Sequence, residues 1–119
     1  MERMKYFIER EYTNGGRVRI YGTPEEPLFL VYNIMEWVKF HNITVFDSPT
    51  FKGKVVAPVE WDYYTTSHGT IFPQTEVLLT ISGLKELRPY VDKDDLDRYI
   101  YKCVALITEY RMTLIEDGE

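Results

Sequence analysis

Basic residues that alternate with other residues in two short segments are the feature of this sequence that points most directly to chemistry. One residue separates Arg17 from Arg19 in a segment typical of a β-strand, and a single glycine separates Lys52 from Lys54 in the same way. Alternate side chains of a strand project from one face about 7 Å apart. Because this separation is close to the phosphate spacing of a nucleic-acid strand, the pattern favours binding of a polyanion.

Tyrosine and a further lysine extend this candidate site. Tyrosine side chains can hydrogen-bond to phosphates or stack on bases, and Tyr21 follows the two arginines on the same strand. The predicted nucleic-acid-binding residues are Arg17, Arg19, Tyr21, Lys39, Lys52 and Lys54. An exposed sheet face with its ordinary share of Arg, Lys and Tyr would show the same pattern, so this alternative stays open.

The sequence contains no recognisable catalytic or metal-binding motif. His41 and His68 are far apart and Cys103 is the only cysteine, so the spacing of a zinc site is missing. Glycine-rich phosphate-binding motifs are also missing. The acidic run over residues 92–95 lacks the glycine and final glutamate of a calcium loop. We therefore expect no enzymatic activity, no cofactor and no metal.

Length and composition indicate one folded domain over residues 1–119, because 119 residues with 45% hydrophobic side chains suit a single core. No apolar run is long enough to span a membrane. The N-terminus lacks the apolar stretch of a secretory signal, and the lone cysteine suits a reducing compartment. We therefore expect an intracellular protein, in the host cytoplasm or nucleus if the protein is viral.

The net charge of −5 argues against a wholly basic nucleic-acid coat. Charge is also uneven, because residues 1–23 hold five bases and three acids and the remainder is acidic. This polarity is consistent with a domain that orients on a polyanion and equally with an ordinary solvated surface.

The first half of the chain predicts a hairpin, a buried strand and a helix. Residues 4–12 and 17–21 flank a glycine-containing turn, as in a β-hairpin. Residues 28–31 are all apolar and predict a buried strand. Asn33 is placed to cap a helix that runs to about His41. Residues 43–66 contain strand-like stretches, such as residues 54–56, but prolines and a glycine interrupt them, so this region predicts a ribbon or a long loop.

The second half predicts another hairpin, which joins residues 61–66 to 70–79, and two helices. A short helix begins near Thr80 or Ser82 and ends before Pro89. A long helix follows the acidic cluster around Asp92, and residues 113–119 are expected to form a loose acidic tail. The predicted buried face of the long helix consists of Leu96, Ile100, Cys103, Ile107, Tyr110 and Leu114. The fold class is therefore α+β, with a small antiparallel sheet, an N-terminal hairpin, one early helix and two C-terminal helices.

Three segments in this order resemble the Bro-N domain, the N-terminal module of viral BRO proteins and phage antirepressors. They are residues 18–34, residues 79–87 and the final helix up to Tyr110 and Arg111. Tyr32, Asn33, Ile81 and Lys85 stand where the family often has other residues. The resemblance implies an α+β module that binds DNA or regulates transcription.

Two functional hypotheses follow. In the first, the chain is a viral or phage transcription-regulatory module whose basic hairpin and ribbon contact the backbone of double-stranded DNA. In the second, it is a protein-interaction module, an antirepressor or an assembly domain that does not bind DNA. A homodimer is compatible with both hypotheses.

Overall fold

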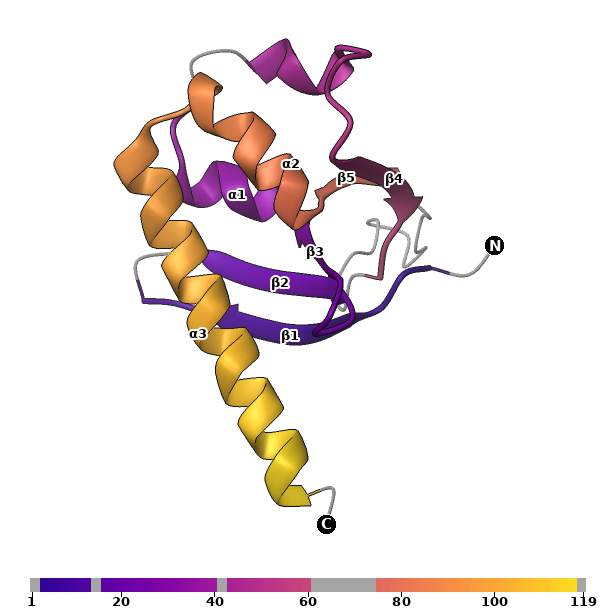
Figure 1. Ribbon diagram of the computed structural model, residues 1–119, viewed down its shortest axis with the longest axis vertical. Helices are drawn as coiled ribbons and strands as arrows, with labels where there is room; N and C mark the ends of the chain where they lie inside the picture. Colours follow the sequence, from indigo (N-terminus) through magenta and orange to yellow (C-terminus); the bar gives the residue numbers. More distant parts are fainter. Residues whose placement is uncertain (1–2, 14–15, 41–42, 61–74, 118–119) are drawn as a thin grey trace, which may run out of the picture.

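Three α-helices and an antiparallel sheet make up most of the described part of the chain, so the predicted α+β class is confirmed (Figure 1). The computed structural model describes residues 3–13, 16–40, 43–60 and 75–117. Side chains from all three helices pack with one face of the sheet in a common core. The long C-terminal helix crosses the first two strands and extends beyond them.

The sheet has the strand order β1-β2-β3-β5-β4, and all neighbouring strands are antiparallel. Its strands are β1 (Tyr6–Glu11), β2 (Arg17–Gly22), β3 (Pro27–Leu30), β4 (Lys54–Pro58) and β5 (Thr75–Leu79). The N-terminal hairpin and the buried third strand are confirmed. Within the region predicted as a ribbon or long loop, the strand-like residues 54–56 belong to the regular strand β4, which pairs with β5. The other predicted hairpin arm, residues 61–66, lies outside the described residues.

The helices are α1 (Val31–Trp37), α2 (Ile81–Leu87) and α3 (Lys93–Asp117), with short 3₁₀ helices at Ile43–Asp47 and Arg88–Tyr90. The predicted start of α1 is wrong, because Asn33 lies inside the helix and does not cap it. Its buried side-chain Oδ1 instead accepts a hydrogen bond from the Arg19 backbone N–H at 2.9 Å. Asn33 therefore connects α1 to the sheet. The helix also ends earlier than predicted, at Trp37.

The predicted starts of α2 and α3 are confirmed by side-chain caps. The Thr80 hydroxyl accepts a hydrogen bond from the Gly83 N–H at 3.0 Å. Asp92 Oδ1 accepts hydrogen bonds from the N–H groups of Asp94 and Asp95, at 3.0 and 3.1 Å. The acidic cluster thus begins the long helix, where its negative charge also suits the helix dipole. Residues 113–117 belong to this helix, so the expected loose tail is wrong there.

The buried face of α3 is rotated from the predicted one. Leu96 and Cys103 are buried as expected, but Leu114 is 49% exposed. Tyr99 and Leu106 are buried instead. The buried face of α3 is therefore centred on Tyr99, Cys103 and Leu106. This is the side of α3 that α1 and strand β1 contact. A smaller cluster on the opposite face of the sheet contains Tyr21, Leu30, Val59 and Leu78.

A contact between two glycines fixes α2 against the edge of the sheet. A Cβ atom on Gly83 would lie 2.0 Å from the carbonyl oxygen of Gly53, which immediately precedes β4. The same carbonyl accepts a hydrogen bond from the Thr80 N–H at 3.0 Å. Only a residue without a side chain allows this approach, so Gly83 sets the distance between α2 and the start of β4.

Replacing Gly83 with alanine should therefore destabilise the protein. At an exposed position inside a helix, a change from glycine to alanine increases stability by as much as about 1 kcal/mol. At Gly83, however, the added methyl group would overlap a backbone carbonyl. We expect a net loss of about 2 kcal/mol in the free energy of unfolding, measured by urea denaturation. Ser82→Ala, at an exposed neighbouring position, is the matched control. A Gly83→Ala variant as stable as the parent would contradict the close contact.

Candidate functional site

Arg17, the first predicted nucleic-acid contact, is engaged by helix α1. Its guanidinium lies 3.2 Å from Glu36 Oε2, and its backbone N–H donates to Glu36 Oε1 at 3.3 Å. The guanidinium carbon also lies 5.9 Å from the centre of the Tyr32 ring. The positive charge of Arg17 is therefore balanced by a carboxylate and helps to join α1 to β2.

Arg19 is buried, so the prediction that it lies on an exposed sheet face is wrong. Its side chain is 1% exposed and its Nε donates to Glu9 Oε2 at 2.6 Å, across the register of β1 and β2. Burial alone would lower the pKa of Arg19, but the hydrogen bond and charge of Glu9 raise it above the ordinary value. Arg19 thus stays charged inside the fold and is neutralised there.

Glu9→Gln should be strongly destabilising, because it leaves the Arg19 guanidinium buried without a negative partner. Arg19 is buried but the Glu9 side chain is 31% exposed, so we expect a loss of about 2 kcal/mol in the free energy of unfolding, less than for a fully buried ion pair. Glu11→Gln, on the same strand at an exposed position, should change this free energy by less than about 0.5 kcal/mol. Urea denaturation of both variants measures the difference, and equal stability would refute the role of the pair.

Tyr21 is also buried, and its predicted exposed position is wrong. Its hydroxyl donates a hydrogen bond to the backbone oxygen of Glu60 at 3.1 Å. Burial raises the pKa of Tyr21 to about 12, although the nearby Arg19 acts in the opposite direction. This phenol is therefore a neutral part of the smaller core and cannot contact a phosphate without unfolding.

The raised pKa of Tyr21 predicts a loss of stability at alkaline pH. Above pH 10.0, its ordinary pKa, the unfolded chain releases the phenolic proton while the folded chain keeps it up to about pH 12. Deprotonation thus favours the unfolded state, by about 1 kcal/mol at pH 11. Urea denaturation of the parent at pH 9 and pH 11 should show this fall. In Tyr21→Phe the fall should be smaller, and an identical fall would disprove the assignment.

The three predicted lysines lie elsewhere. Lys39 and Lys52 are exposed, and their backbone N–H groups donate to Asp95 and Glu86. Lys54 is half-buried, and its ammonium donates to the backbone oxygen of Phe46. Strand β4, which begins at Lys54, is separated from β2 by two strands, or about 14 Å between strand axes. The structure therefore does not bring the six predicted residues together on one surface.

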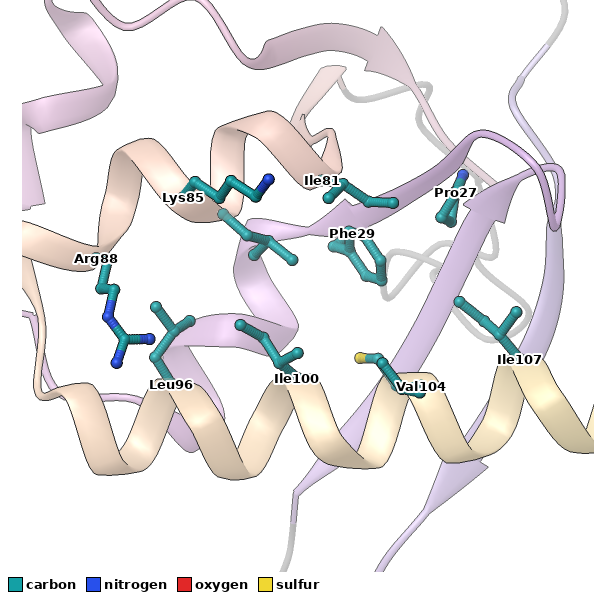
Figure 2. A pocket seen from close by; sticks show the side chains of 11 residues that line it. Pro27, Phe29, Ile81, Lys85, Arg88, Leu96, Ile100, Val104 and Ile107 are labelled. Atoms are coloured by element: carbon teal, nitrogen blue, oxygen red, sulfur yellow. The ribbon is translucent and has the colours of Figure 1, made fainter.

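A different feature, an apolar groove between α2 and α3, is the strongest candidate for a functional site. It has a volume of about 240 Å³, and its floor includes Phe29 of β3. One wall is formed by α2 and the other by α3 (Figure 2). Its main apolar lining residues are Pro27, Phe29, Ile81, Leu84, Ile100 and Val104.

Two aliphatic side chains of this groove remain largely in solvent. Ile81 of α2 is 51% exposed and Val104 of α3 is 56% exposed. Each comes from a different wall, so the groove offers apolar surface on both sides rather than a single isolated residue. Adjoining exposed apolar surface of this kind typically marks an interaction site.

The two ends of the groove differ in charge. Lys85 and Arg88 lie toward one end, and Pro27 and Ile107 lie at the other (Figure 2). Arg88 is paired with Asp97 at 2.6 Å. A more open depression continues from Pro27 and Ile81 and is lined by Glu25 and Glu26. Because Arg88 is balanced by Asp97, the positive charge at this end comes from Lys85, and Glu25 and Glu26 lie beyond the opposite end.

The loop that carries these glutamates is tied to α3. Arg111 of α3 donates a hydrogen bond to the backbone oxygen of Pro24 at 2.7 Å. The acidic end is thus held against the same helix that forms one wall of the groove.

Cys103, in the groove lining, is not a candidate nucleophile. It is 1% exposed, and burial raises the pKa of its thiol to about 12. A thiolate is the reactive form, so this side chain stays protonated near neutral pH. Cys103 therefore acts only as a small apolar side chain in the lining of the groove.

Comparison with known proteins gives no relative: no protein-family model, curated protein or solved structure matches the chain. The resemblance to Bro-N domains therefore stays a prediction. Within the described part of the chain, no three His, Cys, Asp or Glu side chains gather where they could hold a metal ion. No helix there is long and apolar enough to cross a membrane.

Proposed function

We propose that the chain is a protein-interaction module that binds an apolar segment of a partner protein in the groove between α2 and α3. The observation that carries this proposal is the groove itself, with Ile81 and Val104 exposed on its opposite walls. This is the second of the two hypotheses that the sequence left open. It is also compatible with the resemblance to phage antirepressors.

The size of the groove favours side chains of a protein over a large cofactor. Sites for small molecules commonly enclose about 300–1,000 Å³ and cover most of the ligand. This groove is smaller, at about 240 Å³, and open along one side. A partner helix that inserts a few apolar side chains needs no deeper cavity, because the rest of the helix stays in solvent.

The two charged ends of the groove give the partner a direction. An acidic end of the partner suits Lys85, and a basic end suits Glu25 and Glu26. Helices commonly carry acidic residues in their first turn and basic residues in their last. We therefore infer that the partner is an amphipathic helix whose N-terminal end lies beside Lys85.

The DNA hypothesis has less support in the structure. Arg17 and Arg19 are paired with Glu36 and Glu9, and Tyr21 is in a core. Polyanion binding depends on cations that are free to neutralise phosphates. The two exposed lysines of the predicted set, Lys39 and Lys52, do not make a basic surface by themselves.

The groove can be tested with 8-anilinonaphthalene-1-sulfonate, a fluorescent probe with apolar rings and one anionic group. The parent should bind it with increased fluorescence, and Ile81→Asp should weaken binding roughly tenfold through loss of apolar contact and charge repulsion. Val56→Asp is the control, because Val56 is similarly exposed but lies on β4 outside the groove. Equal binding by all three proteins would refute the site.

The direction of the partner needs a second measurement. Helical peptides selected from a random display library should carry apolar residues at intervals of three and four, with an acidic N-terminal end. Lys85→Glu should weaken the selected peptides, and an added N-terminal lysine in the peptide should restore binding. Selection of peptides without this polarity would contradict the orientation. A gel shift with duplex DNA at low salt, unchanged by Ile81→Asp, would favour the DNA hypothesis instead.

A further inference from the structure

Helix α3 carries a second apolar stripe, on the side away from the core. The six residues of this outer stripe are all exposed, and Tyr101 reaches 73%. They are Tyr101, Val104, Ala105, Thr108, Met112 and Ile115. At 3.6 residues per turn they fall within an arc of about 100°, roughly opposite the face that packs on the sheet.

This stripe is unlike an ordinary solvated helix face, which is rich in charged residues. Between Arg98 and Glu116, none of the residues on this arc is charged. Figure 1 shows that the C-terminal part of α3 projects beyond the strands, so its outer side is open to a partner. A helix with apolar residues on two opposite faces usually has a neighbour on each.

We propose that the outer stripe is an interface between two copies of this chain, with their α3 helices packed antiparallel about a two-fold axis at Thr108. In this arrangement Tyr101 of one copy faces Ile115 of the other, and Val104 faces Met112. The stripe from residue 101 to residue 115 is about 21 Å long, enough for four turns of helix contact. Ala105 and Thr108 are small, so the helices can approach closely near the axis.

Charge on one flank of the stripe identifies the second copy as the occupant. Arg98 and Glu116 lie on the same flank, at opposite ends. Antiparallel packing places Arg98 of one copy beside Glu116 of the other, at both ends of the interface. In a parallel pair the two flanks are exchanged, so Arg98 of one copy and Glu116 of the other would lie on opposite sides of the interface. Arg98 is 69% exposed in its contact with Asp95, so its guanidinium can also reach a second carboxylate.

The extent of the stripe sets the expected strength of the dimer. Two such stripes would bury on the order of 1,000 Å² in total, at the lower limit for specific interfaces. We therefore expect a reversible dimer with a dissociation constant in the micromolar range. This interface shares Val104 with the proposed partner groove, and its other residues lie outside the groove.

Sedimentation equilibrium over a range of concentrations tests the dimer. The parent should pass from monomer to dimer, and Thr108→Glu should raise the dissociation constant at least about tenfold, because two carboxylates meet at the axis. Thr113→Glu is the matched control, since Thr113 is exposed on α3 but outside the stripe. A parent that remains monomeric throughout, or a dimer unaffected by Thr108→Glu, would overturn the proposal.

Charge exchange tests the antiparallel direction. Arg98→Glu and Glu116→Arg should each weaken the dimer, and the double variant should recover the parent's dissociation constant. Failure of the double variant to recover would exclude the proposed pairing.

A cross-link tests the register. Thr108→Cys should form a disulfide-linked dimer under mild oxidation, because the two residues meet at the axis. Thr113→Cys should not, and the buried Cys103 should not compete. Equal cross-linking at positions 108 and 113 would refute the register. None of these substitutions changes Ile81 or Lys85. The absence of a dimer would therefore not affect the interpretation of the binding experiments on the groove.

Discussion

The packing of one face of α3 against α1 and the sheet is the constraint on which the other features depend. The helix has 25 residues and is therefore about 37 Å long, which exceeds the width of the two strands that it crosses. Burial of Tyr99 and Leu106 fixes its rotation and directs Val104 away from the core. With α2 held by the contact between Gly53 and Gly83, this rotation creates both the groove and the outer stripe.

The basic residues of the hairpin serve the fold rather than the surface. Arg19 lies inside the molecule and is paired with the partly exposed Glu9, and Arg17 joins β2 to α1 through Glu36. Alternation along β2 holds, since Val18 and Ile20 face the main core and Arg19 and Tyr21 the other side. Both sides of this strand are covered, however, so the number of cations in the sequence says little about the charge of the surface.

Local signals in the sequence were sufficient for the hairpin, the short helix α2 and the long helix α3. The caps Thr80 and Asp92 act on residues two or three positions away, so they can be recognised without the fold. The role of Asn33, the burial of Arg19 and the pairing of β4 with β5 could not be predicted, because each depends on a contact distant in the sequence. The groove likewise combines β3, α2 and α3. The one feature of the sequence that could have indicated the groove is Val104, an aliphatic residue of the long helix that lies outside its predicted buried face.

Val104 also links the two proposed surfaces energetically. It lines the groove, and it belongs to the outer stripe, so its side chain can be covered by the partner helix or by the second copy. If one occupant covers it, the other loses part of its apolar contact, and the two equilibria compete. By thermodynamic reciprocity, self-association must weaken partner binding by the same factor as partner binding weakens self-association. The shared residue therefore makes the monomer the form that is expected to bind the partner most tightly.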